Sequence, residues 1–198
     1  MGRFRPALFI KIRNISEILY MACRSLASIT LDKCATNRGG ILKVWMIDRD
    51  DVTITKSVDS NQNETGEITI AVASGKAWSA FEFRKGSSSY NSELTVDDAN
   101  GISFMTSTLV LAFAKQEVAK RVAVQSVISN PNLFVVVKDG NGEYTAMGVD
   151  EPASVTAGGA NAGQAASDAN NYTVTVTSVE NELPYFVAET SRPDYSAQ

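Results

Sequence analysis

The stretch VVVKDGNGEYTAMG, residues 135–148, constrains the fold more than any other part of the sequence. It joins two apolar runs through Asp-Gly-Asn-Gly, and glycine and asparagine supply the positive φ angles that tight strand connections need. An EF-type calcium loop would instead need a bidentate Glu that closes a loop of about 12 residues, with a helix after it. Here Glu143 comes four residues after Asp139, and a β-prone run follows. The stretch therefore predicts a β-hairpin rather than a metal site.

Most of the remaining chain also alternates in the manner of β-strands. In residues 40–55, Trp45 and Ile47 fall on one side of the alternation and Val44 and Met46 on the other, so both sides are apolar. A strand with two apolar sides is predicted to lie in the middle of a sheet, where both of its faces are covered. Further strands are predicted at residues 68–74, 77–86, 88–101, 102–115 and 172–179.

Two segments lack this alternation. Residues 56–67 are polar and rich in turn-forming residues, which predicts a loop or the tip of a long hairpin. Residues 157–171 are rich in Gly, Ala, Ser and Asn, which predicts a long loop. This second segment has no Lys or Arg and lacks the Gly-Lys-Ser/Thr ending of a phosphate-binding loop, so we do not expect it to bind phosphate.

One segment has the period of a helix. In residues 115–130, Val118, Val122 and Val127 recur at helical spacing, and Lys and Gln side chains occupy other positions around the helix. Asn130-Pro131 ends the pattern, because proline cannot continue a helix. We expect a helix of about four turns that lies on one face of a sheet, with the three valines toward the sheet.

The chain is long enough for one domain. It has 198 residues, of which 44% are hydrophobic, and no second domain is needed to bury a full core. Charged residues interrupt the apolar positions of the first 20 residues before they reach the length of a signal sequence core or a membrane span. We expect residues 1–20 to be an extension outside the fold and Met21 to be the working start. Residues 21–187 are predicted to form a single domain and residues 188–198 a C-terminal tail.

The sequence contains no histidine, which removes Ser-His-Asp and Cys-His catalysis and the commonest zinc ligand. Cys23 and Cys34 are too few for a metal knuckle; a disulfide between them stays open, and we expect free thiols in a reducing compartment. The adjacent acids Asp50 and Asp51 would point in different directions on a strand. We therefore predict no catalytic residue, no cofactor and no metal ligand, and no enzyme.

The formal net charge of −4 is unevenly distributed. Residues 1–20 carry four basic side chains and one acidic side chain, so the rest of the chain carries −7. Proteins that bind nucleic acids tightly neutralise phosphates with clustered Lys and Arg. We therefore expect little affinity for DNA.

The order of these elements resembles that of tail tube (major tail) proteins of long-tailed bacteriophages, particularly those of Bacteroidetes phages and prophages. In that family a long strand leads into an amphipathic helix with an acid and a Lys-Arg pair, here Glu117, Lys120 and Arg121. A hairpin with a turn like KDGNGEY follows, then a small-residue loop with an acid before YTVTVT, here Asp168. The opening CATNRGGILKVWMIDRDDVTIT is also similar, and the resemblance covers about residues 21–187.

This resemblance implies a mainly β fold with one flanking α-helix, either a β-sandwich or a curled β-barrel. It also implies six-membered rings that stack into a tube through which DNA passes during ejection. The protein would be assembled in the host bacterial cytoplasm and lie in the tail of the virion. Its partners would be further copies of itself, other tail or neck proteins, and DNA in transient, non-specific passage, with no membrane anchor.

Polar hairpin tips and small-residue loops are the parts expected to contact neighbouring copies. The candidate interface residues are Lys56, Asp59, Asn61, Asn63, Glu64, Gly158, Gly159, Asn161, Gln164 and Asp168.

Two other functions stay open. One is a head-to-tail connector or tail terminator of the virion, which would share the fold and differ in ring number and position. The other is a surface-binding β-sandwich, which a cluster of exposed aromatic side chains would mark. The large aromatic residues fall at strand positions, where a place in the core is the stronger expectation; they are Trp45, Trp78, Phe81 and Phe83.

Overall fold

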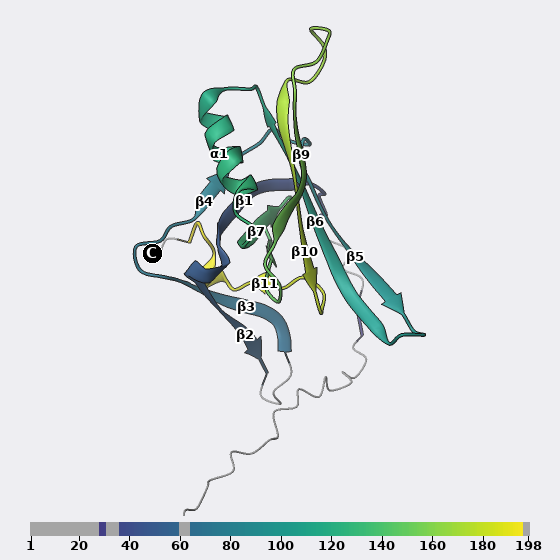
Figure 1. The fold of residues 1–198 in the computed structure, drawn as a ribbon. Helices are drawn as coiled ribbons and strands as arrows, with labels where there is room; N and C mark the ends of the chain where they lie inside the picture. The colour runs from purple at the N-terminus through teal and green to yellow at the C-terminus, as the bar shows by residue number, and fades with distance from the viewer. Residues whose placement is uncertain (1–27, 31–35, 60–63, 196–198) are drawn as a thin grey trace, which may run out of the picture. The chain divides into compact units, whose positions relative to one another are not determined.

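The computed structural model describes residues 28–30, 36–59 and 64–195. All the elements below belong to the compact unit that begins at Cys34, and they form two β-sheets and one α-helix (Figure 1). Sheet A has seven strands, in the spatial order β2 (Val52–Val58), β3 (Glu64–Val72), β11 (Phe186–Val187), β8 (Tyr144–Met147), β7 (Leu133–Asp139), β1 (Ile41–Asp48) and β4 (Ser79–Phe81). Sheet B has four, in the order β5 (Ser89–Asp97), β6 (Ile102–Ala114), β10 (Asn171–Glu180) and β9 (Ser154–Asn161).

The predicted hairpin at residues 135–148 is confirmed. Strands β7 and β8 pair antiparallel, with Lys138 opposite Tyr144. In the turn, Asp139 Oδ1 accepts hydrogen bonds from the backbone N–H groups of Asn141 (2.8 Å) and Glu143 (2.9 Å), and Gly142 has a φ of +94°. The Asp139 side chain therefore stabilises the backbone of its own turn. Within the described ranges no three His, Cys, Asp or Glu residues group in a way that could hold a metal ion.

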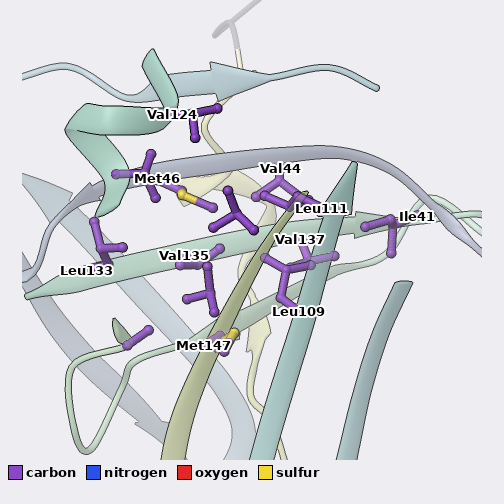
Figure 2. Packing of buried hydrophobic residues seen from close by; sticks show 14 of the residues in the cluster. Ile41, Val44, Met46, Leu109, Leu111, Val124, Leu133, Val135, Val137 and Met147 are labelled. Carbon is purple, nitrogen blue, oxygen red and sulfur yellow. The ribbon is translucent and has the colours of Figure 1, made fainter. Parts of the chain in front are cut away.

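The main core lies between the two sheets, and strand β1 contributes to it as the sequence predicts. Val44 and Met46 point toward sheet B, where they pack with Leu109 and other apolar residues (Figure 2). Helix α1 (Val118–Ile128) adds Val124 to the same cluster. Full burial of one such side chain stabilises the fold by roughly 1.5–3 kcal/mol.

A second core lies on the other face of sheet A. Trp45 on β1 and Phe134 on β7 pack there with Ile68 on β3, which requires sheet A to curl so that β2 and β3 cover the far side of β1 and β7. Both faces of β1 are thus buried, and its predicted central position is confirmed. The two sheets do not close into a barrel. Of the two expected architectures, the β-sandwich is the one observed.

Two predictions need correction at their boundaries, and a third is confirmed. The strand expected at residues 77–86 is limited to β4, which has three residues. Residues 56–58 and 64–67 belong to β2 and β3, with Val58 opposite Glu64, so the prediction that this polar stretch is the tip of a long hairpin is confirmed for the described residues. Residues 157–161 are not loop but the second half of β9, since their backbone pairs with β10, with Gly158 opposite Val174. Pairing with a neighbouring strand outweighs the weak strand preference of Gly and Ala.

The helix is where the sequence predicts one, but its buried face differs. Val124 and Val127 are each 7% exposed, whereas Val118 is 80% and Val122 is 60% exposed. The expectation was right for Val127 and wrong for Val118 and Val122. Valines are spread around the helix, so the spacing alone does not select one face. The helix contacts β10 and β9, and this contact decides which valines are covered.

The end of the described chain packs on sheet A. A short 3-10 helix, η2 (Glu189–Ser191), leads to Asp194, whose carboxylate accepts a hydrogen bond from the Tyr144 hydroxyl (2.6 Å) and lies 3.2 Å from Lys138 Nζ. The predictions about residues 1–20, Met21, Cys23 and Cys34 lie outside the described residues. No helix in the described ranges is long and apolar enough to cross a membrane.

Candidate subunit interface

Sheet B has two open edges. Its outer strands are β5 and β9, and within the described residues neither has a further strand beside it (Figure 1). Proteins usually protect such edges with lysine, proline, irregular pairing or very short strands. Strand β9 is eight residues long and contains no charged residue and no proline, and β5 is nine residues long with only Glu93 and Asp97 as charges. These edges are therefore open to pairing with another chain.

Strand β9 is also unusually accessible. Its residues from 156 to 161 are exposed, and four of them in succession are Ala or Gly. The pairing of β9 with β10 is irregular between Val155 and Ala157, and beyond that point the register is regular to Asn161. Small side chains let a neighbouring backbone approach closely, so the regular part of β9 is suited to adding a strand.

The outer face of sheet B is uncharged over its two central strands and combines threonine with apolar side chains. Thr108 lies opposite Thr177 and Val110 opposite Thr175, and these side chains are partly buried, whereas their neighbours Leu109 and Val176 are in the core. The four strands of sheet B contain no Lys or Arg. A phosphate backbone that passed over this face would meet no basic side chain from these strands.

A buried carboxylate fixes sheet B to sheet A. Glu180 ends β10 and is 2% exposed. Its carboxylate accepts hydrogen bonds from three successive backbone N–H groups, those of Gly148 (2.7 Å), Val149 (3.0 Å) and Asp150 (2.8 Å). Burial raises the pKa of Glu180 above its ordinary range, against the opposing effect of these hydrogen bonds.

Arg49 binds the carbonyl groups of the same turn, whose N–H groups are bound by Glu180. Its guanidinium donates to the carbonyl oxygens of Gly148 (3.1 Å) and Val149 (3.2 Å). Gly148 has a φ of +91°, and a Cβ there would lie 2.7 Å from the Leu133 carbonyl oxygen, so only glycine fits this turn. The turn leads directly into β9 and thus sets the position of that edge strand.

The predicted interface residues fall into two groups on different sheets. Lys56 and Glu64 lie on β2 and β3 of sheet A, where Lys56 Nζ is 3.0 Å from Asp150 Oδ1 and the Tyr185 hydroxyl donates to Glu64 at 2.7 Å. Burial lowers the pKa of Lys56, but hydrogen bonds with Tyr185 and Asp150 outweigh this and raise it above the ordinary value. Asp59 follows β2 and is exposed, and Asn61 and Asn63 lie outside the described residues.

The second group lies on sheet B. Gly158, Gly159 and Asn161 belong to the edge strand β9, and Gln164 and Asp168 belong to the loop between β9 and β10. Asp168 Oδ2 accepts hydrogen bonds from the backbone N–H groups of Gln164 and Ala165, both at 2.7 Å, and these bonds lower the pKa of Asp168. Five of the predicted residues therefore lie together on sheet B, three on the edge strand β9 and two in the loop that joins β9 to β10.

Sequence reasoning missed three features of this site. The edge position of β5, the clamp by Glu180 and the support from Arg49 depend on partners far away in the chain. The absence of Lys and Arg from β5 and β6 is visible in the sequence, but it does not show that β5 is an edge strand.

The four large aromatic side chains pack in or against the two cores, as expected. Trp45 is 3% exposed and stacks on Tyr144, with ring centroids 5.7 Å apart. Trp78 packs against the second core, and Phe81 and Phe83 pack against the main core.

No match to the chain was found among models of protein families, curated proteins or solved structures.

Proposed function

We propose that this chain is a phage tail tube protein whose sheet B pairs edge to edge with sheet B of neighbouring copies. The observation that carries the proposal is the pair of unprotected edges, β5 and β9, on one four-stranded sheet. Because the two edges are different surfaces, β5 of one copy pairs with β9 of the next, and such head-to-tail contacts form a ring when the rotation from copy to copy closes. The resemblance in sequence implies six copies in that ring.

The charge of sheet B supports a passage for DNA. If the outer face of this sheet lines the ring, the wall presents threonine, valine and alanine side chains from β6 and β10, and β5 adds the charged residues Glu93 and Asp97. A basic wall would bind phosphates and would have to release each of them before the genome advanced. A wall without Lys or Arg on its strands lets the polyanion move.

The rings of a tube stack, whereas a connector or terminator works as a ring at one position in the virion. Both functions use the same edge pairing, so the length of the assembly distinguishes a tube from a connector or terminator.

A surface-binding β-sandwich has less support, because the aromatic residues that would have marked it pack in or against the two cores; they are Trp45, Trp78, Phe81 and Phe83.

Negative-stain electron microscopy of the purified protein over a range of concentrations tests the proposal. We expect rings or tubes of uniform diameter. The variant Ala157→Lys/Ala160→Lys places charge on the exposed β9 edge and is expected to remain monomeric. The control Ala73→Lys/Ala77→Lys places the same charge in the exposed connection between β3 and β4 of sheet A and is expected to assemble like the parent protein.

Three results would contradict the proposal or change it. Absence of closed rings from the parent protein at every concentration would overturn it. Equal assembly of the β9 variant would show that β9 is not the interface. Single rings that never stack would favour the connector or terminator function.

A further inference from the structure

Sheet B also differs between the two ends of its strands. Its longest strand, β6, has 13 residues, so its ends lie about 40 Å apart at roughly 3.3 Å per residue. One end is the turn from β5 to β6, and the other adjoins the β9–β10 loop and helix α1 (Figure 1). The first end projects beyond its neighbours and the second is hollowed.

At the first end, β5 and β6 continue as a two-stranded ribbon, which we define as residues 94–104. Strand β10 stops at Glu180, opposite Met105, so the ribbon has no third strand in the described structure. Leu94 is 61%, Val96 53% and Ile102 45% exposed. A two-stranded ribbon with exposed apolar side chains is only marginally stable alone and needs cover from a partner.

The tip of this ribbon is acidic. Strands β5 and β6 and their turn contain three acidic residues and no basic residue. The carboxylate of Asp97 is held inside the turn by Asn100 Nδ2 (2.6 Å) and by the backbone N–H of Ala99 (3.1 Å). Asp98 is exposed and has no hydrogen-bond or ion-pair partner in the described part of the chain. The tip therefore presents the negative charges of Asp97 and Asp98, and only the Asp98 carboxylate has no hydrogen-bond partner within the described residues.

At the other end, a cavity of about 510 Å³, which we call the basic pocket, lies between the β4–β5 loop, the end of β6 and the β9–β10 loop. Arg84 and Lys115 line it, and Asp168 is its acidic residue. The Asp168 carboxylate is already bound by backbone N–H groups of its own turn. Lys115 Nζ lies 3.3 Å from Glu117, whereas Arg84 has no carboxylate partner in the described ranges.

One atom of the basic pocket lacks a partner. Asn171 lines the pocket, and its side-chain oxygen Oδ1 is buried without a hydrogen bond from any described residue. Buried acceptors in native structures are nearly always satisfied. An occupant that offers a hydrogen-bond donor, such as a backbone N–H or an amide group, would satisfy this one.

We infer that the ribbon tip of one copy inserts into the basic pocket of a second copy, so that successive rings stack head to tail. The inference rests on the proposed function for the existence of rings, but the contact itself needs only two copies. Asp98 would lie near Arg84 and Lys115, and the tip would cover the pocket wall that contains Asn171. The two surfaces are at opposite ends of one sheet, so the contact repeats without limit, as a tube requires.

Cysteine cross-linking tests the contact. In a background with Cys23→Ser and Cys34→Ser, one preparation carries Ala99→Cys on the ribbon tip and another carries Ser167→Cys at the pocket; both positions are exposed. A short bismaleimide is added to each preparation and to their mixture. We expect covalent dimers in the mixture only, and a ladder of longer products from a chain with both substitutions.

Charge variants show whether the stated residues make the contact. Asp98→Lys or Arg84→Glu is expected to lower the yield in the mixture roughly fivefold, which corresponds to about 1 kcal/mol for an exposed pair. The Asp98→Lys ribbon with the Arg84→Glu pocket is expected to restore the yield. The control Glu189→Lys changes an exposed acid on η2, beside sheet A and part of neither surface, and is expected to have no effect.

The outcomes separate this inference from the proposed function, because rings are counted by electron microscopy in the same samples. Closed rings without mixed cross-links would overturn the inference alone. Cross-links between the two preparations without closed rings would overturn the proposed ring and support the contact between the ribbon tip and the basic pocket. Dimers of the Ala99→Cys chain by itself would indicate tip-to-tip contact and overturn the inference.

Discussion

Glu180 connects the two sheets through a single side chain. Its carboxylate is the acceptor for three backbone N–H groups of the turn that leads from β8 to β9, and two of these groups, those of Gly148 and Val149, are buried. An acceptor lost at this position leaves those groups without partners, and each buried unsatisfied group costs about 1–3 kcal/mol. The geometry of the β9 edge therefore depends on this residue.

We expect Glu180→Ala to lower the free energy of unfolding by at least about 2 kcal/mol, because two buried N–H groups lose their acceptor. Glu180→Gln keeps an acceptor oxygen but does not titrate. Because burial raises the pKa of Glu180 in the folded state, its contribution to stability is full below the unfolded pKa of about 4.3 and is lost as the pH rises through the folded pKa. Urea unfolding of both proteins between pH 4 and 7.5 measures this.

The advantage of the parent protein over Glu180→Gln is expected to shrink as the pH rises across that range. A difference that stays constant with pH would show that Glu180 has the same pKa in both states.

The helix valines provide a second comparison of single residues. Val124→Asp would bury an unpaired charge and is expected to lower the free energy of unfolding by about 3 kcal/mol or more. Val122→Asp is the matched control, because Val122 is 60% exposed and a surface change costs within about 0.5 kcal/mol. Thermal or urea unfolding of both variants checks this. Equal losses at the two positions would mean that the helix packs by a different face.

At the scale of elements, the segment after β11 covers part of sheet A. Arg192 lies over the Tyr144 ring at 4.7 Å, and the Tyr144 hydroxyl donates to Asp194. Burial raises the pKa of Asp194, but hydrogen bonds from Tyr144 and Lys138 outweigh it and hold the pKa below its usual value. This segment therefore acts as part of the fold up to Asp194.

We expect Asp194→Ala to lower the free energy of unfolding by about 1–2 kcal/mol, since it removes two hydrogen bonds to a partly exposed carboxylate. Tyr195→Ala is a control next in sequence, where the side chain is 47% exposed. Urea unfolding at neutral pH measures both. If the two variants lose equal stability, the contact with Tyr144 is not what holds this segment.

At the scale of the whole molecule, charge separates a conduit from a DNA-binding protein. Residues from Met21 onward carry a formal charge of −7, and the strands of sheet B lack Lys and Arg. Arg84 and Lys115 are the two basic residues of the pocket, at one end of this sheet. Such a distribution gives few sites where phosphates are held.

We expect the chain that starts at Met21 to bind duplex DNA no more tightly than the non-specific range of about 10⁻⁴ to 10⁻⁶ M, even at low salt. Fluorescence anisotropy with a labelled duplex measures this. Submicromolar binding at physiological salt would contradict the conduit and favour a connector that contacts DNA.

Local structure was largely determined by the sequence itself. The turn at residues 139–143, the long strand β6 and the helix after it follow from neighbours within a few residues, because turn residues and side-chain period act over that range. Apolar residues on both sides of β1 also predicted its burial on two faces. Within the candidate site, the sequence identified residues of β9 and of the loop after it as interface residues. It predicted all of them to lie in a loop, whereas residues 157–161 belong to the edge strand β9.

The rest was decided only by the tertiary structure, because it depends on residues far apart in the chain. Gly158 is in a strand because it lies opposite Val174, and Val124 is buried because the helix contacts β10. The clamp on Gly148 joins it to Glu180, 32 residues away, and to Arg49, 99 residues away. No local pattern encodes which strand ends a sheet, since an edge is defined by the absence of a neighbour that the whole fold must place.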